Sequence, residues 1–156
     1  MGKNMKYFFV YWLPPVVWMV FIFPSNNTLT SDSTSHIIVP VIRWLLPLAD
    51  QQTVDLLHKL IRKTFHFLNY GFLTFLLFRA FRGRDKRWEL KWVVYACLVA
   101  IWYGSVDEFA QTMMPSRTGS IFDWMIDSAG SVFALCTLYL RKEWLNLALR
   151  KSEIAR

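Results

Sequence analysis

The residues of this chain that could do chemistry are concentrated in positions 104–130, within otherwise strongly apolar sequence. Four carboxylates, a glutamine and an arginine fall there: Asp107, Glu108, Asp123, Asp127, Gln111 and Arg117. A charged side chain costs free energy in the hydrocarbon of a membrane, so acids inside spanning sequence mark a candidate functional site. Carboxylates at such positions could serve as general acids or bases.

The composition indicates what kind of protein must position these residues. Of the 156 residues, 54% are hydrophobic and 17% aromatic, which fits one small domain in lipid better than a soluble core. Cys97 and Cys136 each lie in an apolar run without neighbouring metal ligands, so they predict neither a disulfide framework nor a zinc site. Because we find no dense metal-ligand motif, we expect no metal and no other cofactor.

Four apolar segments are long enough to cross a hydrocarbon core of about 30 Å as helices of about 20 residues. They lie at about 7–23, 63–81, 92–114 and 120–140. The first is somewhat shorter and needs its flanking residues to complete the crossing. Pro14 and Pro15 are expected to kink the first segment, and Pro115 to close the third. We therefore predict an all-α membrane protein with four transmembrane helices in a single domain over residues 1–156.

The sequence between the first two spans divides into three parts. Residues 25–35 are polar and helix-averse, and predict an exposed loop. Residues 37–50 are apolar but too short to span and are interrupted by Pro40 and Pro47, so we expect a helical segment in the outer interface or a shallow re-entrant segment. From about Gln52 apolar residues recur at helical spacing, which predicts an amphipathic lead-in to the second span.

The distribution of lysine and arginine predicts the orientation. With the amino terminus in the cytoplasm, thirteen of the eighteen Lys and Arg residues fall inside and five outside. The positive-inside rule therefore favours both termini in the cytoplasm of a multi-pass protein. The net charge of +7 does not indicate nucleic-acid binding, because the basic residues are divided among three short cytoplasmic segments and form no single face.

On this topology the candidate site residues gather at the outer ends of three helices. They are Lys63, His66 and Tyr70 on the second, Asp107, Glu108 and Gln111 on the third, Asp123 and Asp127 on the fourth, and Arg117 in the loop before the fourth. Residues three or four apart share a helix face, as His66 and Tyr70 do. Asp127 lies deepest, about 10 Å along its helix. If ionised, it needs a cation, and Lys63, His66 and Arg117 are available.

These residues resemble the pattern of the VanZ-like family of bacterial membrane proteins. Lys63, His66 and Phe67 match a Lys-x-x-His-Phe run that opens the second helix, and are followed by Tyr70 and Gly71. The second half of the pattern, Asp-Glu-x-x-Gln, then proline, arginine, aspartate and a later glycine, is matched by Asp107, Glu108, Gln111, Pro115, Arg117, Asp123 and Gly130. At one position the chain departs, because many relatives have asparagine in place of Asp127.

The resemblance implies a location and a general role, but not a reaction. The family is linked to the cell envelope and to lower susceptibility to glycopeptides such as teicoplanin. We therefore expect a multi-pass protein of the bacterial plasma membrane whose partner is a membrane lipid or a lipid-linked cell-wall precursor.

Three interpretations of the polar cluster remain open. In a lipid-headgroup enzyme, Glu108, Asp107, His66 or Asp123 would transfer protons. In a binder, a lipid-linked wall precursor, a lipoteichoic component or an antibiotic would be held without proton transfer by Lys63, Arg117, Gln111, Asp127 and Tyr70. In the third interpretation, these side chains only pair with one another and pack the helices, as interhelical polar contacts do at about 0.6 kcal/mol each.

Overall fold

The computed structural model describes the backbone of residues 3–28, 31–84, 88–113 and 120–154, and the side chains of 5–23, 35–84, 88–113 and 120–144. Every element in these ranges is helical. α1 (Lys3–Tyr7), the π-helix η1 (Phe8–Trp12) and α2 (Leu13–Thr28) follow one another directly. They are succeeded by α3 (Ser31–Leu45), α4 (Gln51–Arg82), α5 (Leu90–Thr112) and α6 (Ile121–Ile154).

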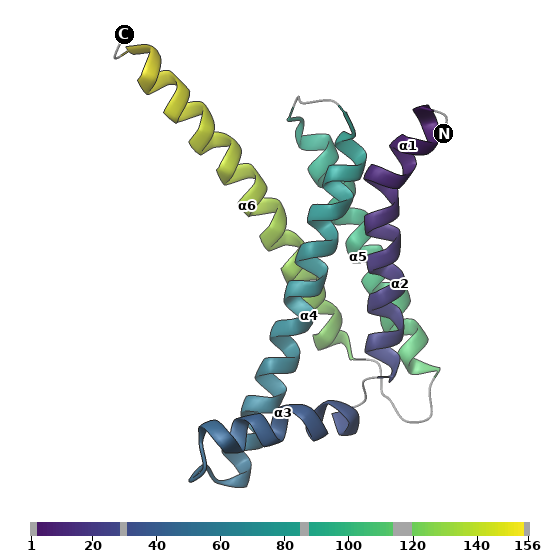
Figure 1. Ribbon diagram of the computed structural model, residues 1–156, viewed down its shortest axis with the longest axis vertical. Coiled ribbons are helices and arrows are strands. Elements are labelled where there is room, and N and C mark those ends of the chain that lie inside the picture. The colour runs from purple at the N-terminus through teal and green to yellow at the C-terminus, as the bar shows by residue number, and fades with distance from the viewer. Residues whose placement is uncertain (1–2, 29–30, 85–87, 114–119, 155–156) are drawn as a thin grey trace.

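Three helical stretches are long and apolar enough to cross a membrane: Met5–Phe23, Leu90–Thr112 and Ile121–Trp144. They include the whole first predicted span, the third as far as Thr112 and the fourth from Ile121 onward; Met113 forms a turn, and Met114 lies outside the described residues. The predicted second span, 63–81, lies within α4, which packs beside these helices (Figure 1) but is not among the three. Polar residues within this span, such as His66 and Asn69, lower its hydropathy. Its membrane crossing remains a prediction.

The predicted kink near Pro14 takes the form of the π-helical turn η1. The backbone N–H of Leu13 bonds to the carbonyl of Phe8, five residues back. Proline has no N–H for the carbonyl four residues earlier, which for Pro14 is that of Val10. The Arg79 guanidinium of α4 donates to this carbonyl at 3.2 Å instead. A side chain of α4 thus satisfies the group that Pro14 leaves free.

The predicted exposed loop over residues 25–35 is wrong for the residues that are described. Residues 25–28 continue α2, and residues 31–35 form the first turn of α3. Ser, Thr, Asp and Asn are common at helix ends, so a polar run of this kind can join two helices without a long loop.

The helical segment expected over residues 37–50 is α3, with an earlier start and an earlier end than predicted. It continues through Pro40, which did not break it as expected, and ends at Leu45. It lies crosswise at the base of the molecule in Figure 1. The Arg43 guanidinium donates to the side chain of Gln51, the first residue of α4.

The lead-in to the second predicted span is confirmed as part of α4, a single helix of 32 residues. The Asp50 carboxylate caps its start by accepting from the backbone N–H of Thr53 at 3.3 Å. The hydrogen bonds from Thr53 also hold the pKa of this carboxyl below its usual value. Gly83 ends the helix with a φ of 57°, a conformation that side chains disfavour.

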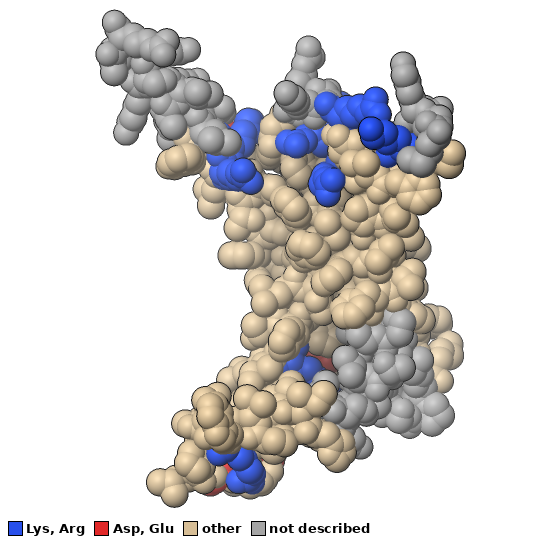
Figure 2. Space-filling model, viewed as in Figure 1, with Lys and Arg blue, Asp and Glu red and all other residues tan. Residues whose placement is uncertain are grey.

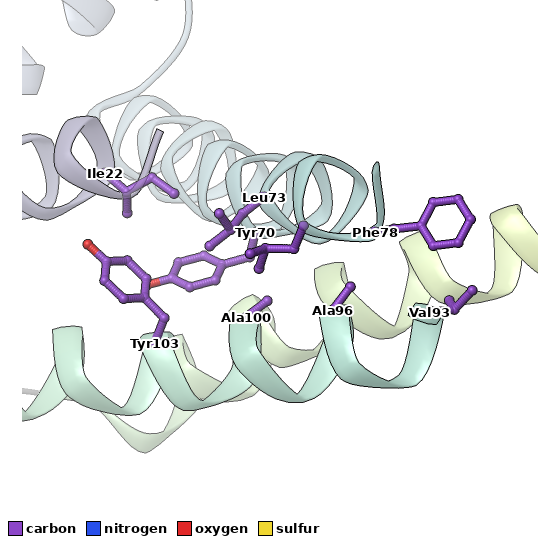
Figure 3. Packing of buried hydrophobic residues seen from close by; sticks show 9 residues of the cluster. Ile22, Tyr70, Leu73, Phe78, Val93, Ala96, Ala100 and Tyr103 are labelled. Carbon is purple, nitrogen blue, oxygen red and sulfur yellow. The ribbon is translucent and has the colours of Figure 1, made fainter. Parts of the chain in front are cut away.

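The apolar core lies between α2, α4 and α5. Ile22, Tyr70, Leu73, Ala100 and Tyr103 project toward one another from these three helices (Figure 3). Two hydrogen bonds hold α2 to this core. Tyr103 Oη donates to the carbonyl of Met19 at 2.6 Å, and Trp18 Nε1 donates to that of Asn69 at 3.2 Å. These contacts position the face of α4 that carries the candidate site.

Candidate functional site

Two glycines allow α4 and α6 to approach closely beside the candidate site. A Cβ atom at Gly130 of α6 would lie only 2.1 Å from the carbonyl oxygen of Phe67 in α4. A Cβ at Gly71 would lie 3.2 Å from the Gly130 carbonyl oxygen. Real Cβ atoms do not approach as closely as the first of these distances, so only glycine fits at position 130. The crossing brings the polar residues one turn away on each helix into contact.

One polar contact between α4 and α6 joins His66 to Asp127. His66 Nδ1 lies 3.2 Å from Asp127 Oδ1, and the Asp127 side chain is 1% exposed. The predicted need of Asp127 for a partner is therefore met by His66. Since Nδ1 faces the carboxylate, Nε2 on the opposite side of the ring is the atom left to meet a ligand. Asp127 Oδ2 is buried without a hydrogen-bond partner among the described residues.

One turn toward the start of α6, two cations share the Asp123 carboxylate. Lys63 Nζ lies 3.5 Å from Oδ1, and Arg62 Nη2 lies 3.8 Å from Oδ2. All three side chains are partly exposed: 41% for Lys63, 31% for Arg62 and 20% for Asp123. Such partly exposed ion pairs contribute little to stability, so these cations can be released to another anion at low cost.

A third set of contacts is fully buried between α4 and α5. Asp107 is 0% exposed, and its Oδ2 accepts from Tyr70 Oη at 3.4 Å and from Gln111 Nε2 at 3.2 Å. Hydrogen bonds of this kind are needed because a buried carboxylate without them is very costly. Tyr70 and Gln111 therefore position Asp107 inside the bundle rather than at its surface.

Glu108 caps the start of α6 by a hydrogen bond. Its Oε2 accepts from the backbone N–H of Ser120 at 2.8 Å. The first N–H groups of a helix lack partners within the helix and attract negative charge. Glu108 therefore stabilises the end of α6 that carries Asp123. The side chain is 8% exposed, and its Oε1 has no hydrogen-bond partner within the described ranges.

A groove of about 310 Å³ lies next to Glu108, between α5 and the start of α6. Its lining is mostly apolar and consists of Ser105, Glu108, Phe109, Thr112, Ser120, Ile121 and Trp124. Trp124 Nε1 donates to Ser105 Oγ at 2.9 Å across it. The groove thus meets the polar cluster at Glu108 and Ser120.

The structure brings together eight of the nine predicted site residues through these contacts on α4, α5 and α6. The ninth, Arg117, lies outside the described residues. Sequence reasoning did not assign site roles to Ser105, Trp124 or Arg62. Arg62 was visible as a basic residue beside Lys63, whereas the Trp124–Ser105 contact depends on how α5 and α6 pack and has no signal in the sequence. Within the described ranges no group of three His, Cys, Asp or Glu side chains could hold a metal ion.

Comparison with known proteins places the chain in a family. The model of the VanZ/LLP1 family matches residues 8–142, which include α4, α5 and most of α6. Neither the curated proteins nor the solved structures compared with the chain gave a match. Because the family model covers most of the sequence, including every residue of the candidate site, the chain belongs to the VanZ/LLP1 family.

Proposed function

We propose that this protein is a multi-pass protein of the bacterial plasma membrane that binds the anionic group of an envelope lipid or lipid-linked cell-wall precursor. The site is the polar cluster of α4, α5 and α6, facing outward. Three apolar helices long enough to span support the membrane placement. The resemblance that links the family to glycopeptides supports a role in lowering susceptibility to antibiotics such as teicoplanin.

The observation that carries this proposal is the pair of cations on Asp123. Arg62 and Lys63 are partly exposed and share one carboxylate at distances of 3.8 and 3.5 Å. A phosphate group, with several acceptor oxygens and up to two charges, can take the place of the carboxylate. His66, 14% exposed, lies one turn deeper and can donate to the same group.

Binding of phosphatidylglycerol or undecaprenyl phosphate to the purified protein tests the proposal. A double variant, Arg62→Ala with Lys63→Ala, is expected to lose at least tenfold in affinity, since hydrogen bonds to charged groups contribute about 1.5–3 kcal/mol each. Asp123→Asn is expected to tighten binding, because the competing charge is removed. Lys59→Ala, a change of an exposed lysine one turn earlier in α4, is the matched control.

Equal affinities in the double variant and in Lys59→Ala would contradict the proposal. If binding is unchanged but the double variant unfolds at a lower temperature, the cluster serves only to pack the helices. The resistance role is tested by expression in a susceptible bacterium. The minimal inhibitory concentration of teicoplanin should rise with the parent chain and with Lys59→Ala, and stay at the host value with the double variant.

A second candidate function, acid–base catalysis on a lipid-linked phosphate or glycan, is favoured by the His66–Asp127 contact. A carboxylate on Nδ1 orients an imidazole so that Nε2 can take or give a proton. Incubation with undecaprenyl diphosphate should then release inorganic phosphate, and His66→Gln should abolish the release while undecaprenyl phosphate still binds. Binding without any turnover by the parent chain would exclude this reaction.

A further inference from the structure

The groove between α5 and α6 has the composition of a site for hydrocarbon. Phe109, Ile121 and Trp124 supply apolar surface along it. Most of its polar groups are already hydrogen-bonded, and Glu108 Oε1, which has no such partner within the described ranges, is buried. Trp124 Nε1 donates to Ser105 Oγ, Thr112 Oγ1 donates to the carbonyl of Phe109 at 2.6 Å, and Glu108 Oε2 accepts from Ser120. A ligand in the groove therefore meets apolar surface and few free donors.

The position of the groove agrees with this chemistry. Both helices that form it are apolar enough to span a membrane, and the adjoining side chains are exposed, with Phe109 at 63% and Ile121 at 64%. In a bilayer such side chains contact lipid. At about 310 Å³, the groove is at the lower end of the range for small-molecule sites.

The groove is also continuous with the polar cluster. Glu108 and Ser120 line it, and Asp123, which holds Arg62 and Lys63, follows Ser120 within the first turn of α6. A molecule with a charged group at the cations and a chain in the groove would lie across the start of α6. Such a molecule is an amphiphile with its headgroup toward the outer surface.

We infer that the groove binds a hydrocarbon chain of the same lipid whose anionic headgroup binds at Arg62 and Lys63. This inference rests on the proposed function and makes it more specific. The ligand is a membrane lipid held at both its headgroup and its chain, and not a free phosphate or a soluble peptide. In the bilayer the chain exchanges contacts with other lipid for van der Waals contacts with the groove, so affinity should depend on how much of the chain the groove holds.

Variants that fill the groove test the inference with three probes: dioleoylphosphatidylglycerol, dihexanoylphosphatidylglycerol and glycerol phosphate. Thr112→Phe places a ring in the groove and is expected to weaken binding of the dioleoyl lipid about tenfold, because the ring takes the space in which the chain would pack. Binding of glycerol phosphate should be unchanged, and the dihexanoyl lipid should show a smaller loss. The matched control is Val106→Phe, an exposed position on α5 that does not line the groove.

The outcomes separate the two proposals. The inference fails if Thr112→Phe and Val106→Phe bind the dioleoyl lipid equally well, or if Thr112→Phe weakens all three probes alike. If the Arg62 and Lys63 double variant also keeps its affinity for all probes, the proposed headgroup site fails independently of the groove. Loss of teicoplanin binding in Thr112→Phe with unchanged lipid binding would assign the groove to the antibiotic and overturn the inference. Thermal unfolding of each variant verifies that it is folded.

Discussion

At the scale of single residues, Asp127 is explained by its partner. The resemblance pattern has asparagine at this position in many relatives, and both side chains carry an oxygen that can accept from an imidazole N–H. In this chain Asp127 is almost completely buried and contacts His66 Nδ1 at 3.2 Å. What the position requires is therefore an acceptor for His66, which a carboxylate or an amide can provide.

This requirement predicts different results for two changes at position 127. Asp127→Asn keeps an acceptor, so the unfolding temperature in detergent should stay close to that of the parent chain. Asp127→Leu leaves His66 without its partner in a buried place, and should cost about 1–3 kcal/mol of stability. Equal stability of the two variants, measured by thermal unfolding, would show that the contact contributes nothing.

Glu108 shows that one residue of the cluster has a structural role as well. Its Oε2 caps the start of α6, so replacing it affects the position of Asp123 along with any direct contact to a ligand. Loss of function in a Glu108 variant is therefore poor evidence for catalysis. Lys63 is a better residue for functional tests, because its side chain is partly exposed and contacts Asp123 at the edge of the cluster.

At the scale of elements, the crossing of α4 and α6 depends on Gly130. Its missing Cβ leaves room for the carbonyl of Phe67, and the same crossing places His66 against Asp127. Gly71, on the other side of the contact, has more room, because a Cβ added there would lie 3.2 Å from its nearest neighbour. A side chain at position 130 would therefore clash more severely than one at position 71, although both glycines lie at the same crossing.

We expect Gly130→Ala to separate the helices and to destabilise the protein by about 1–3 kcal/mol, as overpacking does. Gly71→Ala should cost much less, because the higher helix propensity of alanine offsets part of the closer contact. Thermal unfolding of both variants and a lipid-binding assay check this. The expectation is wrong if Gly71→Ala is the more harmful change.

From the contact between Arg79 and the π-helical turn, we predict an energetic coupling between α4 and η1. Arg79 of α4 donates to the Val10 carbonyl that Pro14 cannot satisfy, so Arg79→Ala should cost about 1 kcal/mol. In a Pro14→Ala background, the backbone N–H of residue 14 becomes available to the Val10 carbonyl once the turn relaxes to an α-helix. Arg79→Ala should therefore cost less stability in that background. A double-mutant cycle of unfolding free energies measures this coupling, and strict additivity of the two changes would refute it.

At the scale of the whole molecule, charged side chains lie toward the two ends of the long axis. In Figure 2 most of the visible Lys and Arg gather at the end where α1 begins and α6 extends away, further basic and acidic side chains lie toward the other end, and the band between them carries neither. At the basic end, Lys142 Nζ lies 4.5 Å from the ring centre of Trp88, and Lys91 Nζ lies 4.6 Å from that of Trp92. Paired Trp and Lys side chains of this kind are typical of membrane interfaces.

This arrangement predicts which sites are reached from outside the cell. In a Cys136→Ser background, since Cys136 is exposed, a cysteine at Leu48 should react with an impermeant maleimide added to intact cells. A cysteine at Arg84, at the other end of α4, should react only after the membrane is opened. Labelling of both positions from outside would show that α4 does not cross, and labelling of Arg84 alone would invert the topology.

Periodicity and hydropathy predicted the α4, α5 and α6 helices because a helix is a local structure whose apolar pattern can be read from neighbouring residues. The same local rules failed over residues 25–35, where a polar run was interpreted as a loop although it continues α2 and begins α3. Polar residues are compatible with helix ends as well as with loops, and their identity alone does not distinguish the two.

The sequence by itself indicated apolar helices long enough to span a membrane and the set of polar residues that share helix faces, since these follow from composition and spacing, and its motif residues resembled the family to which the chain belongs. Only the tertiary structure decided the partners: His66 with Asp127, Arg62 and Lys63 with Asp123, and Glu108 with the start of α6. The physical reason is that partners on different helices depend on where the helices cross. That crossing depends on the space available at Gly130, a contact between residues more than sixty positions apart.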